Sequence, residues 1–153
     1  ICTWGRFMDK ESHKRFWFFT LHTDHKGEQS QIESCRLVLD RIKKMCHGER
    51  AVLTGDFNVG ETSTCHSIIC ESGILSDAYD SSPIRLTTTG TENWFDPDIK
   101  TFRRIDHIFI TPGFTPLRYG ILTDTYRVPT DVPGKYRAHT PSDHFPVVVE
   151  LAY

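Results

Sequence analysis

Apolar residues along the chain gather in several short runs and in one long periodic segment. Residues 15–21 (RFWFFTL) form a short, aromatic, β-prone run, which predicts a buried strand. Between residues 32 and 46, apolar side chains recur at steps of three and four. This is the spacing of an amphipathic helix of roughly four to five turns, which Gly48 would end. The run at residues 51–54 (AVLT) predicts a second strand.

The rest of the chain holds one short helix, a polar stretch and three further strands. A helix is expected near residues 63–72, and the polar, turn-rich residues 81–101 predict a long excursion over one rim of the domain. Apolar runs predict strands at three places: residues 105–111, 117–123 and 145–151. A strand, a helix and a strand followed by several strands indicate a layered α/β domain with a mixed sheet.

The composition of the 153 residues, with 38% hydrophobic and 25% charged side chains, is that of a globular protein and argues against a disordered chain. Lysine and arginine (18) nearly balance aspartate and glutamate (20), so bulk charge gives nucleic-acid binding no support, although it does not exclude it. No apolar run reaches the ~20 residues of a membrane span. The five cysteines contain no C-x-x-C pair, so we expect buried or idle thiols, and they assign no compartment.

A carboxylate and an amide follow the second predicted strand in the motif G-D-F-N, as Asp56 and Asn58. An extended chain aims two such side chains the same way. An ionised aspartate binds a hard cation or accepts hydrogen bonds, and the asparagine could hold the same cation or a phosphate oxygen. The alternative is an Asx-turn at the end of a strand.

The motif S-D-H before the last predicted strand places Asp143, a second hard ligand, beside His144. A histidine can exchange a proton near neutral pH or, when charged, stabilise a developing oxyanion. The alternative here is a capped turn whose histidine faces solvent.

Asp106 lies inside an apolar strand, where a carboxylate needs a partner. The partner is either an arginine, Arg103 or Arg104, or a histidine that Asp106 orients as in a catalytic triad. His107 would point to the opposite face and is expected to be structural.

Three ligand-type side chains, His22, Asp24 and His25, follow the first predicted strand. They could form a zinc-binding clip, although they lack helical metal-site spacing, or Asp24 and His25 could be solvated. Residues 94–98 (WFDPD) fit either a substrate-edge loop or a tethered surface turn. The other histidines lack such context and are expected at the surface: His13, His47, His66 and His139.

The order of these motifs resembles the endonuclease/exonuclease/phosphatase superfamily, whose fold is DNase-I-like. The resemblance runs from Thr3 to Leu151 and rests on T-W-G-R-F, L-H-T-D-H-K-G (where the family has T-H-x-D-H-x-G), G-D-F-N, R-I-D-x-I-F and S-D-H-x-P. It implies an α/β fold that is part of a four-layer αββα sandwich. Residues 1–153 would be the C-terminal part of a single domain, with the N-terminal half and its metal-binding glutamate missing.

The resemblance also implies metal-dependent hydrolysis of a phosphoester by in-line attack of activated water, as in a phosphodiesterase, phosphatase or nuclease. The residue matching Asp56 would position or deprotonate that water and contact the metal, and Asn58 would help to hold the water and the phosphate. Asp143 would bind Mg²⁺ or Mn²⁺. His144, oriented by Asp106, would stabilise the transition state.

His22 would contact the scissile phosphate, with His25 as a further candidate for substrate binding. The expected substrate is a phosphoester of a small molecule, a lipid headgroup or a nucleic acid. The isolated piece is expected to expose an apolar sheet face and to turn over poorly, if at all. The alternative is a non-catalytic binding module that retains the fold. The sequence assigns neither the compartment nor the oligomeric state.

Overall fold

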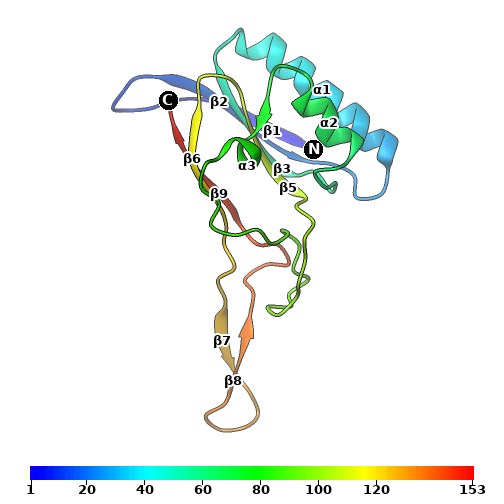
Figure 1. Cartoon of the computed structure of the whole chain (residues 1–153), viewed down its shortest axis with the longest axis vertical. Coiled ribbons are helices and arrows are strands. Elements are labelled where there is room, and N and C mark those ends of the chain that lie inside the picture. Colours follow the sequence, from blue (N-terminus) through cyan, green and yellow to red (C-terminus); the bar gives the residue numbers. More distant parts are fainter.

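The computed structural model describes residues 1 to 153 (Figure 1). Its strands are β1 (Cys2–Met8), β2 (Arg15–His22), β3 (Arg50–Asp56), β4 (Ser76–Asp77), β5 (Asp106–Ile110), β6 (Thr115–Ile121), β7 (Tyr126–Pro129), β8 (Tyr136–His139) and β9 (Val147–Ala152). Its helices are α1 (Glu28–Cys46), α2 (Thr64–Cys70) and α3 (Ala78–Ser81). No helix is both long enough and apolar enough to cross a bilayer.

Five strands form the main sheet, in the order β1-β2-β3-β5-β4. The central pair β2 and β3 is parallel and is connected through α1, whereas the other neighbours are antiparallel. Strands β6 and β9 form a separate antiparallel pair. The hairpin β7–β8 extends away from the body of the molecule (Figure 1).

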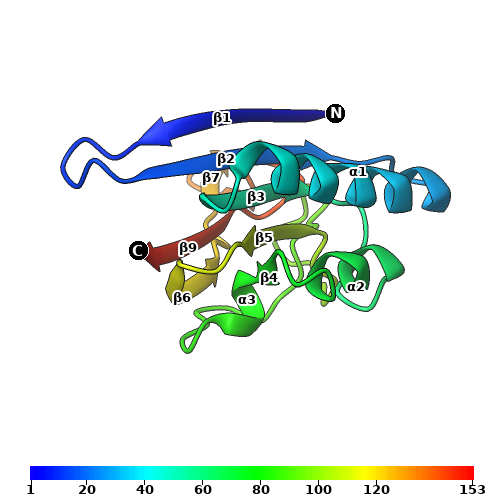
Figure 2. The same cartoon turned by 90° about the horizontal axis from the view of Figure 1, so that it is seen from above.

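The elements are arranged in layers, with α1 and α2 on one side of the main sheet and the β6–β9 pair on the other (Figures 1 and 2). The periodic face of α1 buries Val38 and Ile42 against Phe19, Leu53 and Phe109 of the sheet. A second core fills part of the space between the two sheets: Val52, Ala78, Ile108, Ile110, Tyr119, Ile121 and Phe145. Helices, main sheet and second sheet are three layers of an α/β sandwich.

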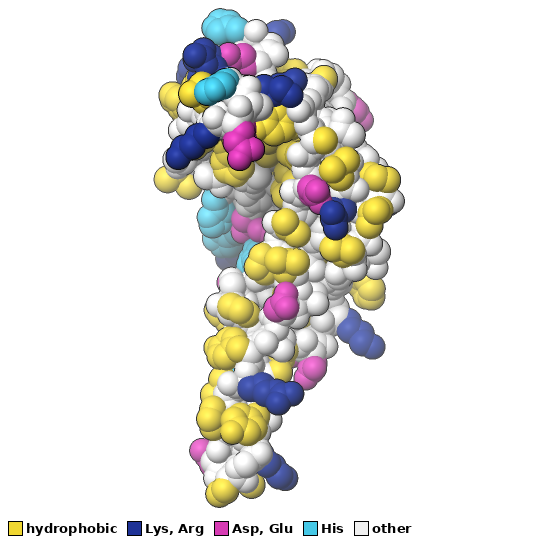
Figure 3. All heavy atoms as spheres, turned by 90° about the vertical axis from the view of Figure 1, so that its left-hand side faces the viewer, with side chains coloured by type: hydrophobic (Ala, Val, Ile, Leu, Met, Phe, Trp, Pro, Cys, Tyr) yellow, Lys and Arg dark blue, Asp and Glu magenta, His cyan; other side chains and the backbone are white.

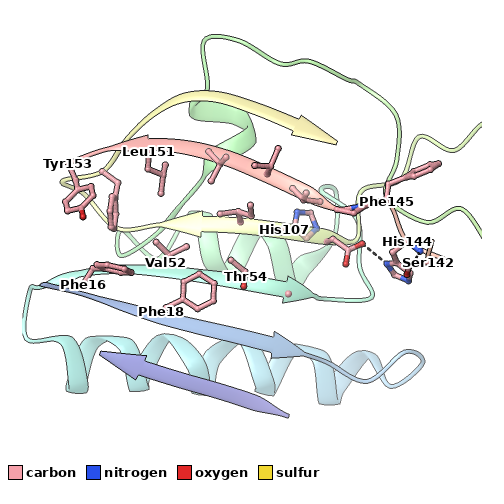
Figure 4. Close-up of a pocket in the computed structure, with 18 residues that line it drawn as sticks. Phe16, Phe18, Val52, Thr54, His107, Ser142, His144, Phe145, Leu151 and Tyr153 are labelled. Atoms are coloured by element: carbon pink, nitrogen blue, oxygen red, sulfur yellow. Dashed lines mark hydrogen bonds and ion pairs between the residues drawn. The ribbon is translucent and has the colours of Figure 1, made fainter. Parts of the chain in front are cut away.

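The β6–β9 pair leaves part of the main sheet uncovered. An open groove of about 680 Å³ runs between β2, β3 and β5 on one side and β9 on the other (Figure 4). Phe16 and Phe18 face it from β2, and Val149 and Leu151 line it from β9. Phe18 is 37% exposed. The groove is the exposed apolar sheet face expected from the sequence.

The strongly patterned elements lie where the sequence predicts them, and the long polar stretch before β5 contains no extended helix or strand beyond α3. Strands β1, β4, β7 and β8 and the short helix α3 were not predicted. Strand β1 is the edge of its sheet, and six of its seven residues are exposed, so it has no buried face to create a pattern. The β7–β8 hairpin is likewise almost wholly exposed.

Candidate active site

The strand register of the main sheet places three polar residues side by side in one row. His22 ends β2 and pairs with Asp56 of β3, and Asp56 in turn pairs with Asp106 of β5. The His22 Nε2 atom lies 3.6 Å from Asp56 Oδ2. Residues far apart in the sequence are therefore neighbours at one end of the sheet.

His144, just before β9, completes the cluster from the other side of the groove. Its Nδ1 donates to Asp106 Oδ2 at 2.7 Å (Figure 4). One ligand atom each of Asp56, Asp106 and His144 lies within 4.8 Å of the others. Of the two partners considered for Asp106, the structure has the histidine rather than Arg103 or Arg104.

The carboxylates around His144 set its charge. Burial alone lowers the pKa of His144, but the hydrogen bond to Asp106 and the charges of Asp106, Asp56 and Asp143 together outweigh burial, so the pKa is raised above 6.5. A raised pKa favours the imidazolium near neutral pH. Since Nδ1 is held by Asp106, Nε2 is the nitrogen left to donate to a substrate.

The turn after β3 is fixed by Asp56 and Asn58 themselves. The Asn58 N–H donates to Asp56 Oδ1 at 2.8 Å, and Asn58 adopts a left-handed conformation with φ of 53°. Its Nδ2 donates to the Thr23 carbonyl at 3.2 Å, and Arg103 donates to the Asn58 carbonyl at 3.1 Å. The Asx-turn considered as an alternative is thus present, and it holds Asn58 beside Asp56.

Gly55 is required by the close approach of β2 to β3. Its φ is 143°, and a Cβ placed there would lie 1.8 Å from the Leu21 carbonyl oxygen. Only glycine can occupy this position, which immediately precedes Asp56.

Two other predicted residues lie outside the three-residue cluster. The Asp143 carboxylate accepts a hydrogen bond from the Ser142 hydroxyl at 3.2 Å and is not a member of the cluster. His25 is exposed, with Nδ1 3.9 Å from Asp24 Oδ1. It lines a polar cavity of about 390 Å³ together with Asn58. The proposed zinc clip is not formed, because His22 pairs with Asp56 rather than with Asp24.

Thr91, which the sequence analysis did not single out, joins the two halves of the cluster. Its buried hydroxyl accepts the N–H groups of Ile105 at 3.0 Å and Asp106 at 3.2 Å. Its carbonyl accepts the Phe145 N–H at 2.7 Å. The next residue, Glu92, pairs with His144 through an isolated antiparallel β-bridge of the backbone. Nothing in the polar pattern of this stretch marks Thr91 as different from its neighbours.

A second titratable cluster is buried on the helical side of the sheet, and it corrects the expectation that His66 lies at the surface. His66 is 8% exposed, and its Nε2 lies 3.0 Å from Asp77 Oδ2. Arg104 donates to the same oxygen through two nitrogens at 3.3 Å, and His107 Nδ1 lies 3.7 Å away. His66 was misassigned because its buried partner, Asp77, lies in a different element.

Asp77 is the shared anionic partner of the cationic groups in this second cluster. The hydrogen bond to Asp77 raises the pKa of His66 to about 9. The pKa of Asp77 is lowered: burial opposes ionisation, but His107, His66 and Arg104 outweigh it. His107 Nε2 donates to the Val59 carbonyl at 2.9 Å. The structural role expected for His107 agrees with these contacts.

The first cluster has the opposite character. Neither Asp56 nor Asp106 has a lysine or arginine ion-pair partner, and both face the same side of the row. His144 pairs with Asp106 but leaves Asp56 without a strong cationic partner, so the two neighbouring carboxylates retain excess negative charge, which attracts a cation. Oxygen ligands of this kind are those preferred by Mg²⁺ and Mn²⁺, so the donor set fits a hard divalent cation.

Comparisons with solved structures confirm the fold. A mannosyl-6-phosphatase of Bacteroides thetaiotaomicron VPI-5482 is 46% identical over 99% of this chain, with a TM-score of 0.93. A Bacteroides vulgatus member of the endonuclease/exonuclease/phosphatase family is 29% identical over 99%, with a TM-score of 0.79. The beta toxin of Staphylococcus aureus, solved with bound magnesium ions, has the same fold at 15% identity over 95% of this chain, with a TM-score of 0.63.

The chain spans 57% of the length of the B. thetaiotaomicron protein, 54% of the B. vulgatus protein and 56% of the toxin. No curated protein matches the sequence. The α/β, DNase-I-like fold expected from the motifs is confirmed. A sequence model of the endonuclease/exonuclease/phosphatase family matches residues 11–144, and the chain belongs to this family.

Proposed function

We propose that the protein hydrolyses a phosphoester by in-line attack of water, with Mg²⁺ or Mn²⁺ as its cofactor. The observation that carries this proposal is the convergence of Asp56, Asp106 and His144 within 4.8 Å from three separate segments of the chain. Membership of the family supports the reaction class.

Asp56 is the proposed acceptor for the proton of the attacking water. Oδ1 accepts the Asn58 N–H, whereas Oδ2 makes no hydrogen bond and lies 3.6 Å from His22 Nε2, so Oδ2 is the oxygen proposed to orient or deprotonate the water. The Asn58 amide is proposed to hold the water and a phosphoryl oxygen. A divalent cation bound by Asp56, with Asp143 as a further ligand, would offset charge on the phosphoryl oxygens.

His144 is the proposed donor to the charge that develops on the phosphoryl group. Asp106 fixes its ring through Nδ1 and favours the charged form, so Nε2–H is presented without reorganisation during the reaction. His22, mostly exposed beside Asp56, is the proposed contact to the scissile phosphate. His25 is proposed to contact the rest of the substrate from the adjoining polar cavity.

The proposed substrate is a phosphate monoester of a small molecule. The phosphatase that is 46% identical to this chain acts, by its name, on a mannosyl 6-phosphate. The formal charge of −2 gives no basic surface excess for a nucleic-acid backbone.

The test is hydrolysis of p-nitrophenyl phosphate by the full-length protein in the presence of Mg²⁺. We expect Asp56→Ala and His144→Ala each to reduce kcat by about 100-fold or more, the usual effect of losing a water activator or an oxyanion donor. Asp131→Ala, in the exposed turn between β7 and β8, is the matched control. Metal-dependent hydrolysis that is unchanged in both cluster variants would refute the assignment. A folded wild-type protein without turnover would favour a binding module.

A further inference from the structure

Two consecutive aromatic residues, Trp94 and Phe95, extend into solvent from the segment between α3 and β5. Trp94 is 69% exposed and Phe95 is 60% exposed. Their φ angles are 55° and 62°, in the left-handed region that residues other than glycine and asparagine rarely adopt. A turn that served only to reverse the chain would favour glycine or asparagine there. This turn instead holds two large rings in water.

Hydrogen bonds to buried Asn93 and to the Asp143 backbone hold the backbone of this turn. Asn93 is fully buried, and its Oδ1 accepts the Phe95 N–H at 2.8 Å and the Thr140 hydroxyl at 3.1 Å. The Asp143 carbonyl accepts the N–H groups of Asn93 at 2.7 Å and Trp94 at 3.0 Å. The backbone that carries both rings is therefore tied to Asn93 and to the Asp143 carbonyl.

The same segment holds the candidate active site together. Asp143 directly precedes His144, and the backbone of Glu92 pairs with that of His144 in a β-bridge. The Thr91 hydroxyl accepts the Asp106 N–H. The backbone of Trp94 is thus hydrogen-bonded to Asp143, the residue that directly precedes the proposed oxyanion donor, His144. Histidine and acidic side chains gather on the face shown in Figure 3, and hydrophobic side chains lie close below them.

We propose that Trp94 and Phe95 form a binding surface for a ring in the alcohol part of the phosphoester. This inference rests on the proposed phosphoester hydrolysis and adds to it the part of the substrate that is not phosphate. Exposed aromatic rings on a rigid support bind flat ring faces by stacking, whether the C–H face of a sugar or a nucleobase. The shared feature is a ring, which hexose phosphates and nucleotides both carry and glycerol phosphate lacks.

The experiment compares kcat/KM for glucose 6-phosphate, adenosine 5′-monophosphate and glycerol 3-phosphate. We expect the ratio of ring substrate to glycerol phosphate to fall about tenfold in Trp94→Ala and in Phe95→Ala, through KM. The substrate whose kcat/KM ratio to glycerol 3-phosphate falls in these variants shows whether the surface binds a sugar or a nucleobase. Trp94→Phe should retain most of the ratio. Phe7→Ala, 52% exposed at the far end of β1, should leave it unchanged.

Binding measured by calorimetry with the same three compounds separates this inference from the proposed reaction. Ring-dependent binding that weakens about tenfold in Trp94→Ala supports the surface even if no hydrolysis occurs. Hydrolysis with an unchanged substrate ratio in both alanine variants overturns the surface and leaves the reaction standing. If ring compounds neither bind nor react better than glycerol phosphate, the inference is wrong.

Discussion

Replacing Asp77 with asparagine should destabilise the fold severely. Asp77 is 2% exposed, and its Oδ2 is the partner of His66 and Arg104. Asparagine keeps the shape but removes the charge, which leaves a guanidinium that is 4% exposed without a counter-ion. Breaking one side of a buried ion pair costs about 3–5 kcal/mol. The hydrogen bond to Asp77 is also the largest cause of the raised pKa of His66, about 9 against 6.5, so the variant should lower that pKa as well.

Urea unfolding of the wild type and of Asp77→Asn at pH 7 measures this difference directly. The matched control is Asp80→Asn, an exposed carboxylate three residues along the chain, which should change the free energy of unfolding by less than about 0.5 kcal/mol. A loss below about 1 kcal/mol in Asp77→Asn would refute the conclusion that the Asp77 cluster is a charged, buried network.

The pH dependence of stability gives the same cluster a second signature. Because the folded pKa of His66 is raised, its contribution is fully present below pH 6.5 and is lost as the pH rises through about 9. Asp77 has a lowered pKa, so its contribution is present above pH 3.8 and is lost on acidification below that value. A His66→Gln variant should lose the alkaline decrease in stability. Retention of that decrease would assign it to another group.

Two further variants test the geometry of the site itself. Gly55→Ala places a Cβ 1.8 Å from the Leu21 carbonyl oxygen, so β2 and β3 must separate. We expect thermal unfolding to show a free energy of unfolding lower by at least about 3 kcal/mol. A wild-type Tm would be incompatible with this packing. Asp106→Asn removes the carboxylate that hydrogen-bonds to His144 and raises its pKa. The alkaline limb of the pH–rate profile should therefore move to lower pH. An unmoved limb would show that His144 is not the group responsible.

The sequence predicts best those elements whose buried face is long enough to create a pattern. Helix α1 and strands β2, β3 and β5 fill the core between the helices and the main sheet. The helix has a periodic apolar face, and each strand has a clear apolar run. Strand β1 is found only by its pairing with β2, since it is stabilised by backbone hydrogen bonds along an exposed edge. An edge strand with few buried side chains has little pattern to detect.

The site was predicted as separate motifs, and its assembly depends on register. A buried carboxylate at Asp106 required a partner, but only the antiparallel pairing of β3 with β5 and the entry to β9 select His144 over an arginine. His66 and Thr91 show the limit of local reasoning. Each acts through a partner more than ten residues away, and neither sits in a recognisable motif.

The most direct test of the central claim, that Asp106 and His144 act as one unit in a single hydrolytic centre, is a double-mutant cycle on phosphoester hydrolysis. Asp106→Asn, His144→Gln and the double variant are compared with the wild type at saturating Mg²⁺. Because Asp106 acts through His144, the double variant should be no slower than His144→Gln alone. Losses in kcat that multiply in the double variant would contradict the account and show that the two residues act independently.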